Sequence, residues 1–142
     1  INNEINLLDI CVKEDLILST ANIAPLSHWI TPNIESRRFD TRFFIAYLPE
    51  KQIVQHDGME LTQSLWINPN KAVDMAFKGE MQMIMPTIKN LQSCSEFTVA
   101  KDMLDSQKRL TNKDIPPILP KFFKENGNWV GLLPGDDGYE DH

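Results

Sequence analysis

The sequence of 142 residues predicts one α+β domain, in which a small mixed sheet carries helices on its faces. This length suffices for one compact domain with a modest core and is too short for two. Apolar residues recur at helical spacing in some segments and alternate in others, without the regular order of βαβ units. The apolar fraction of 42% and the charged fraction of 24% are ordinary for a globular chain.

The first third of the chain predicts a helix followed by two extended segments. Residues 3–16 carry apolar side chains at helical spacing and predict the helix. Residues 22–32 predict a short extended segment that ends at Pro32, because proline cannot donate to a strand ladder. After a loop, residues 38–48 predict a strand whose two faces are both apolar from Phe43 onward. We therefore expect a central strand that is covered on both sides.

The rest of the chain predicts short strands and three helices, joined by turns. Asn68 and Pro69 predict a helix start, since asparagine caps helices and proline fits their first turn, and Gly79 predicts the end. Thr98 is expected to cap a later helix. Strands are expected at 53–55, 59–67, 118–123 and 128–134, helices at 68–80, 85–97 and 98–110, and turns at 49–52, 56–58 and 124–128. The final residues, 134–142, predict a loose acidic tail.

The charge of the chain argues against two classes of partner. The formal net charge is −6, whereas proteins that bind nucleic acid duplexes or anionic membranes carry a basic surface. No apolar run approaches the roughly 18 residues of a membrane span. A small anionic ligand remains compatible with the charge, because local arginines suffice to bind it. The two cysteines, Cys11 and Cys94, have no metal-binding spacing and indicate reduced thiols in a cytoplasmic protein.

Most catalytic signatures are missing from the sequence. It contains no G-x-S-x-G, H-E-x-x-H or G-x-G-x-x-G motif and no phosphate-binding loop. Metal-assisted phosphate chemistry needs carboxylates close together on one helical face. No two of the nine glutamates are closer than ten residues in sequence, so no helix presents such a pair.

The segment from Arg37 to Asp40 is the first candidate for a functional site. Arg37 and Arg38 precede the expected strand, and guanidinium groups suit the oxygens of a diphosphate. The alternative is that both arginines are solvated loop residues, or that Arg38 pairs with Asp40. A carboxylate inside such a strand needs a partner, so a structural bond between arginine and Asp40 is the favoured explanation for that residue.

Glu60 is the second candidate. It follows the turn at Gly58 and precedes Trp66 by six residues. Composition alone favours an exposed strand residue at this position. The functional alternative is a carboxylate close to a metal–phosphate site.

Several stretches, taken together, resemble the Nudix hydrolase superfamily, and most closely the subgroup of the peroxisomal coenzyme A diphosphatase and its bacterial relatives. The resemblance covers nearly the whole chain. W-I-T-P followed by R-R-F-D-T is fairly specific to this subgroup, whereas the stretch from Glu60 to Trp66 is common to Nudix domains. The matching stretches are W-I-T-P (29–32), R-R-F-D-T-R-F-F (37–44), A-Y-L-P (46–49), H-D-G-x-E (56–60), W-I-x-P-x-x-A-V (66–73), M-P-T (85–87) and L-P-G-D-D-G-Y (133–139).

The chain departs from the family at its signature, the Nudix box G-x5-E-x7-R-E-U-x-E-E-x-G-U, which it does not contain. In the family the box lies upstream of the W-I-T-P stretch. The resemblance therefore implies that residues 1–142 are the C-terminal part of a single Nudix domain. The implied fold is a mixed-sheet α/β/α sandwich that is incomplete at its N-terminus, with the helix at 3–16 following the box.

For an intact parent enzyme, the resemblance implies hydrolysis of a nucleoside diphosphate-linked substrate, namely coenzyme A or acyl-coenzyme A. Box glutamates would hold Mg²⁺ or Mn²⁺, which lowers the pKa of the attacking water. Glu60 would be a further metal ligand or catalytic base. Substrate binding is assigned to Arg37, Arg38, Phe39 and Asp40, although packing in the core is the commoner role of a phenylalanine. The chain alone is expected to be inactive, because the box glutamates are missing.

The alternative function is a non-catalytic, Nudix-like module that binds a nucleotide or a protein. A third hypothesis sets the resemblance aside and takes the chain as an acidic interaction domain without affinity for diphosphates. The partner expected for an enzyme is a small molecule of the coenzyme A type, with neither nucleic acid nor a membrane involved. The apolar strand at 38–48 also favours pairing between chains, so a homo-oligomer is expected.

Overall fold

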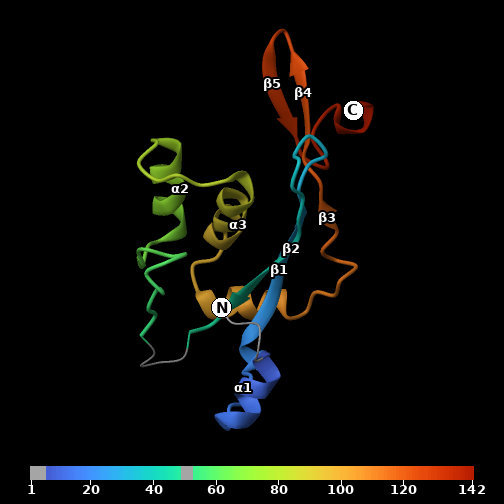
Figure 1. The fold of residues 1–142 in the computed structure, drawn as a ribbon. Coiled ribbons are helices and arrows are strands. Elements are labelled where there is room, and N and C mark those ends of the chain that lie inside the picture. Colours follow the sequence, from blue (N-terminus) through green and yellow to red (C-terminus); the bar gives the residue numbers. More distant parts are fainter. Residues whose placement is uncertain (1–5, 49–52) are drawn as a thin grey trace.

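The computed structural model describes residues 6–48 and 53–142 of the chain (Figure 1). These residues form helices together with one three-stranded and one two-stranded sheet, so the predicted α+β class is confirmed. The turn expected at 49–52 and the first residues of the helix expected at 3–16 lie outside the described residues. The α-helices are α1 (Leu7–Lys13), α2 (Pro69–Phe77), α3 (Met85–Ser95) and α4 (Ala100–Gln107).

The three-stranded sheet is built around β1 (Ile23–Ile30). This strand pairs antiparallel with β2 (Asp40–Ala46) and parallel with the short β3 (Pro117–Ile118), which gives the order β2-β1-β3. The register with β2 shifts between Pro25 and Ser27, and proline within a strand is compatible with such a bulge because it has no N–H to donate. The extended segment predicted at 22–32 is thus confirmed and lies at the centre of the sheet.

The prediction of a central strand at 38–48 is wrong in its position. Within the described residues β2 is an edge strand, and it covers only Asp40–Ala46. Its apolar pattern does not reflect burial on both faces, since the Phe44 side chain is 59% exposed. The alternation of side chains correctly predicts a strand. The apolar pattern does not show whether that strand lies at the centre or at the edge of the sheet.

The helices form largely where the sequence predicts them. The Asn68 side chain accepts hydrogen bonds from the backbone N–H groups of Asn70 and Lys71, which confirms the predicted cap of α2. Helix α1 has a reciprocal capping box between Asn6 and Asp9. The predicted cap at Thr98 is wrong. The N-cap of α4 is the next residue, Val99, whose side chain makes no capping hydrogen bond. Helix α2 packs against α3, and both α3 and α4 contact β1.

Residues 53–68 form no helix or strand, so the strands predicted at 53–55 and 59–67 are wrong. The turn predicted at 56–58 is present, with Gly58 at a φ of 74° and its N–H donating to the Leu61 carbonyl. Apolar residues such as Trp66 remain exposed in this segment. A strand needs a neighbouring strand for its backbone groups, and the described residues supply none here.

A two-stranded hairpin of β4 (Lys121–Glu125) and β5 (Asn128–Leu132) projects from the three-stranded sheet (Figure 1). Its turn contains Asn126 and Gly127 at positive φ angles of 51° and 85°, the conformation that favours Asn-Gly in tight hairpins. The predicted pair of strands and their turn are therefore confirmed, although the first strand begins at Lys121 and Ile118 belongs to β3.

The acidic segment 134–142, expected to be loose, folds back onto the base of this hairpin. The Tyr139 hydroxyl donates to the Leu119 carbonyl at 2.8 Å, and the Lys121 ammonium donates to the Tyr139 carbonyl at 2.7 Å. The imidazole of His142 stacks on the Phe123 ring with centroids 3.7 Å apart. These contacts join residues that are about 20 positions apart in sequence, so the acidic composition of the segment gave no indication of them.

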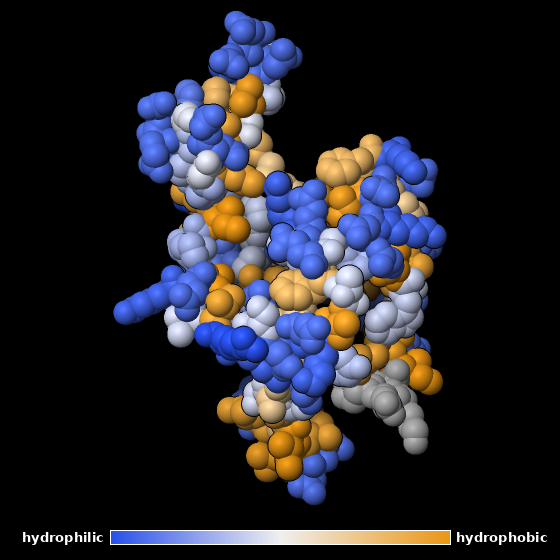
Figure 2. Space-filling view, turned by 180° about the vertical axis from the view of Figure 1, so that it is seen from behind, coloured by the Kyte–Doolittle hydropathy of each residue, from blue (hydrophilic) through white to orange (hydrophobic). Residues whose placement is uncertain are grey.

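The core of the chain is small for its size. In the part of the chain that the structure describes, the buried apolar residues are Ala24, Trp29, Ala72, Val73, Met103 and Leu104. The accessible surface is 11822 Å², whereas a compact monomer of 16.3 kDa exposes about 7,500 Å². Figure 2 shows apolar side chains gathered at the protruding end formed by α1, where Leu8 is 67% and Val12 is 84% exposed. The chain thus presents an apolar surface that water contacts.

We expect the isolated chain to self-associate, because burial of this surface is favourable. Size-exclusion chromatography with light scattering should give a mass above 16.3 kDa that rises with concentration. Replacing Leu8 and Val12 together by lysine should lower the association without changing the fold, since both side chains are exposed. A sharp, cooperative melt of a strictly monomeric chain would contradict the expectation.

Candidate functional site

A cavity of about 500 Å³ lies between the sheet, the start of α3 and the base of the hairpin. This volume is within the range of about 300–1,000 Å³ that is typical of small-molecule sites. The residues that line the cavity are mainly apolar, and several of them are aromatic. Representative lining residues are Trp29, Phe39, Phe43, Met85, Pro120 and Phe122.

The pairing of β1 with β2 determines which side chains face the cavity. Residues directly opposite one another in an antiparallel pair share a face of the sheet. Trp29 is opposite Thr41, and both line the cavity. Ser27, two residues before Trp29, donates a hydrogen bond of 2.7 Å to Asn90 of α3. The cavity therefore lies on the face of the sheet that α3 covers.

Arg37 is the cation at the rim of this cavity. Its guanidinium carbon lies 5.0 Å from the centre of the Phe39 ring, a cation–π contact, and both residues line the cavity. Arg37 is exposed and has no ion pair among the described residues. The structure thus places two of the predicted binding residues, Arg37 and Phe39, at one site.

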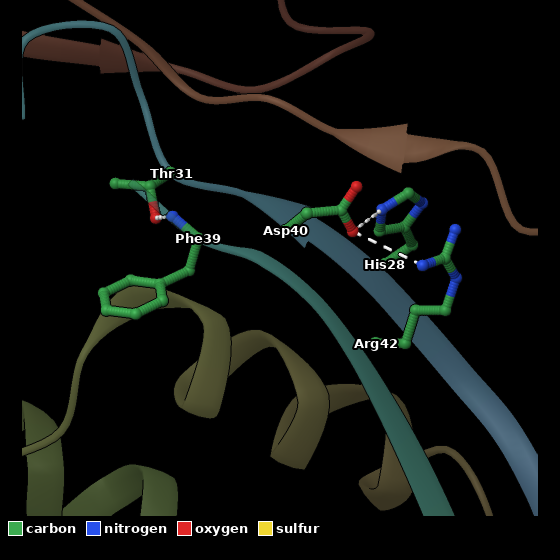
Figure 3. A network of polar contacts seen from close by, with 5 residues as sticks. All are labelled: His28, Thr31, Phe39, Asp40 and Arg42. Carbon is green, nitrogen blue, oxygen red and sulfur yellow. Dashed lines mark hydrogen bonds and ion pairs between the residues drawn. The ribbon is translucent and has the colours of Figure 1, made fainter. Parts of the chain in front are cut away.

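Arg38 has a different position and a structural contact. Its Nε donates to the Thr31 carbonyl at 2.9 Å. Thr31 also accepts a hydrogen bond from the Phe39 N–H through its hydroxyl at 3.0 Å, as Figure 3 shows. These bonds close the loop between β1 and β2, so Arg38 helps to orient Phe39 and does not line the cavity.

Asp40 lies on the opposite face of the sheet from the cavity. Its carboxylate accepts a hydrogen bond from His28 Nε2 at 2.6 Å and lies 3.5 Å from Arg42 Nη1 (Figure 3). The expected pair with Arg38 is therefore wrong, although an arginine does contact Asp40. The side chain is 56% exposed, so it is not the buried carboxylate that the sequence suggested.

Glu60 is exposed and is not among the residues that line the cavity. It lies in the turn that Asp57 organises, where the Asp57 carboxylate accepts hydrogen bonds from the N–H groups of Met59 and Leu61 at 3.0 and 2.9 Å. Within residues 6–48 and 53–142, no three histidine, cysteine or acidic side chains come together to hold a metal ion.

Two residues near these sites were not identified from the sequence. Glu35 lines the cavity together with Arg37, two positions away on the same loop. His28 contacts Asp40 through its Nε2 atom. The register of β1 with β2 brings His28 opposite Arg42, and a sequence without a known register contains no signal for that pairing.

Polar contacts also hold Trp29, the aromatic residue beneath the cavity. Its indole Nε1 donates to the Ser27 hydroxyl at 3.1 Å, which in turn donates to Asn90 of α3. Trp29 is only 4% exposed. A buried indole with a satisfied N–H has a fixed orientation, so this chain of hydrogen bonds gives the cavity a rigid base.

Cys11 and Cys94 are both free thiols, and burial raises the pKa of the Cys94 thiol above its ordinary value.

Among the described residues, no helix combines the length and the apolar character that are needed to cross a bilayer.

Comparisons with known proteins identify relatives of the chain. It is 29% identical over 120 residues to the acyl-coenzyme A diphosphatase NUDT19 of Xenopus laevis, a match that covers 80% of this chain and 31% of that protein. The human protein of the same name is 26% identical over 136 residues, covering 94% of this chain and 36% of the relative. The putative nudix hydrolase 7 of Caenorhabditis elegans is 28% identical over 144 residues, covering 92% and 47%.

These matches confirm the resemblance to the Nudix hydrolase superfamily. Within that superfamily, the chain resembles the subgroup of coenzyme A diphosphatases, as its two vertebrate relatives indicate. The chain spans only about a third to a half of the length of these relatives. No family model matches the chain. No solved structure matches it either.

The turn around Asp57 should respond to acid. The N–H groups of Leu61 and Met59 lower the pKa of the Asp57 carboxyl below its ordinary value of 3.8. A lowered folded-state pKa stabilises the turn above pH 3.8, and this stabilisation is lost as the pH falls through the folded-state value. NMR titration of the Leu61 N–H should show this transition, and Asp57→Asn should abolish it. A titration of the Asp57 carboxyl at or above 3.8 would contradict the expectation.

The contact between His28 and Asp40 should stabilise the pairing of β1 with β2. Asp40→Ala is expected to lower the free energy of unfolding by up to about 1 kcal/mol, because the carboxylate is more than half exposed. Urea unfolding of Asp40→Ala, His28→Ala and the double variant should give a favourable coupling energy. A coupling energy of zero would show that the contact does not contribute to stability.

Proposed function

We propose that the chain is part of a metal-dependent Nudix diphosphatase that cleaves the diphosphate of coenzyme A or acyl-coenzyme A. The observation that carries the proposal is Arg37, a cation without an acidic partner among the described residues, held against Phe39 at the rim of a mainly apolar cavity. The names of the two vertebrate relatives supply the substrate class. Because the chain spans only part of those relatives, the activity is proposed for the whole parent protein.

The role assigned to Arg37 is to bind the diphosphate of the substrate. A guanidinium group presents its N–H donors in a planar fork that matches phosphate oxygens, and its charge offsets theirs. The stack on Phe39 restricts the orientations of the side chain before the substrate binds, which lowers the entropic cost of binding. Arg38 has an indirect role, because its bond to the Thr31 carbonyl fixes the loop that carries Arg37.

The metal dependence belongs to the same proposal. A bound Mg²⁺ or Mn²⁺ would polarise the diphosphate and activate water. Glu60 is proposed as one carboxylate of such a centre, acting as a ligand or a base. Since no three histidine, cysteine or acidic side chains come together among the described residues, further ligands would come from other parts of the parent protein, and this chain alone is expected to be inactive.

A non-catalytic binding module is the second candidate. The observation that favours it is the contrast between a formed cavity with a cation at its rim and the lack of a metal-holding cluster in the described part of the chain. In this alternative Arg37 and the cavity would bind the ligand without turnover. The expected cytoplasmic location and the homo-oligomer are compatible with either function and stay predictions.

The proposal is tested first by activity. Hydrolysis of coenzyme A with Mg²⁺ or Mn²⁺ should be measured for this chain and for the longest natural chain that contains it. Turnover in the longer chain alone is the expected result. Binding without turnover in both chains would favour the module, and neither binding nor turnover would contradict both functions.

Arg37→Ala should weaken coenzyme A binding about tenfold, because it removes a charge-assisted hydrogen bond. The matched control is Arg42→Ala, which removes the same charge from the opposite face of the sheet and should leave the affinity nearly unchanged. Calorimetry at two salt concentrations checks both values, since screening weakens an exposed charge. Equal losses in the two variants would show that Arg37 acts only through net charge.

A further inference from the structure

The tip of the hairpin carries the only asparagine of the sequence that is followed by a glycine, Asn126 before Gly127. These two residues form the turn between β4 and β5, since Glu125 is directly opposite Asn128. Both turn residues are exposed, and the hairpin projects away from the three-stranded sheet (Figure 1). Water therefore reaches the side-chain amide of Asn126 and the backbone of the turn.

An asparagine in such a position can react with its own backbone, which makes asparagine a thermolabile residue. The backbone nitrogen of Gly127 would form a bond to Cγ of Asn126, and the bond from Cγ to Nδ2 would break. The proton of the Gly127 N–H leaves with Nδ2 as ammonia, and a five-membered succinimide remains. Water then opens this ring at Cγ to give aspartate, or at the backbone carbonyl to give an isoaspartate. The sum is one water consumed and one ammonia released, without a cofactor.

The surroundings of the turn favour this attack. Gly127 has no side chain that shields its nitrogen, and the space around the position of a Cβ atom is empty to 4 Å. Among the described residues, the Gly127 N–H donates no backbone hydrogen bond. The nucleophile is therefore free of a bond that would have to break before the ring closes.

The amide of Asn126 is likewise not held in place. In the described part of the chain, hydrogen bonds hold the side chains of Asn22, Asn68 and Asn90 but not that of Asn126. Each of those three asparagines also precedes a residue with a larger side chain or a proline. Asn126 thus combines a free amide with an unshielded neighbour.

The products would change both the charge and the backbone of the turn. Each product adds a negative charge next to Glu125. The isoaspartate also routes the main chain through the side chain and so lengthens it by one methylene. A two-residue turn with φ angles of 51° and 85° is closely matched to the strands that it joins, and a longer main chain does not fit it.

The strand pairs nearest to the turn depend on this match. They are Glu125 with Asn128, followed by Lys124 with Trp129. The Lys124 ammonium lies 5.3 Å from the centre of the Trp129 ring, so this cation–π contact also requires the present register. Loss of the turn should therefore release residues 124–129.

We infer that Asn126 is a site of spontaneous deamidation and that its isoaspartyl product opens the tip of the hairpin while the base stays closed. The base has contacts of its own, since the Lys121 ammonium donates to the Tyr139 carbonyl at 2.7 Å. The Phe122 ring lies over Gly131, where a Cβ atom would be 2.6 Å from Cε1. The inference does not depend on the proposed function.

The first test is peptide mapping by mass spectrometry. The longest natural chain that contains these residues is incubated warm at mildly alkaline pH, where a backbone N–H gives up its proton more readily. The peptide with Asn126 should gain the mass difference between oxygen and NH, and an isoaspartyl form should separate by chromatography. Asn112 is the internal control, because it is exposed in a turn but precedes Lys113. Conversion of Asn126 no faster than that of Asn112 would overturn the inference.

The second test measures hydrogen exchange in the incubated protein. Protection should be lost over residues 124–129 of the isoaspartyl form and kept at the base of the hairpin, at 119–123. Asn126→Gly cannot react, and glycine accepts the positive φ at this position, so its tip should stay protected. Fresh Asn126→Asp adds the charge without lengthening the main chain and should also stay protected. An isoaspartyl form with an intact tip, or an equally open Asn126→Asp, would overturn the role of the lengthened turn.

Discussion

The pairing of β1 with two neighbours is the constraint on which the described structure depends. β1 pairs with β2 on one side and with β3 on the other, and α3 and α4 both contact it. It contributes Ala24 and Trp29 to a core that has few other members. Trp29 also lines the cavity, so the strand that organises the core is also part of the candidate site. Changes to β1 would therefore affect stability and ligand binding together.

The alternation of side chains along β1 and β2 divides the charged residues into two groups with different surroundings. Arg37 and Phe39 border the cavity on the face covered by α3, whereas His28, Asp40 and Arg42 contact one another on the other face. In the second group the hydrogen bond between His28 of β1 and Asp40 of β2 joins the two strands, which supports the register of the sheet. The first group leaves a cation without an acidic partner among the described residues, so it is the group that suits an anionic ligand.

Features that depend on neighbouring residues in sequence were predictable, and features that depend on distant pairing were not. The cap at Asn68 and the turn at Asn126 and Gly127 follow from local hydrogen bonding and backbone geometry. The edge position of β2 and the irregular course of residues 53–68 depend on which strands are available as neighbours. The site followed the same rule. Arg37, which lines the cavity, was selected from its residue type alone, whereas the contact of Asp40 with His28 required the register.

The large accessible surface has a consequence for the thermodynamics of the chain. Unfolding of a compact domain exposes apolar area, and this exposure raises the heat capacity and sets the sensitivity to urea. A chain that already presents 11822 Å² to water has less area left to expose. We therefore expect its stability to change little with temperature and its unfolding transition to be broad until a further surface covers the apolar residues of α1 and β2. Cooperative unfolding would then depend on the surface that covers these apolar residues.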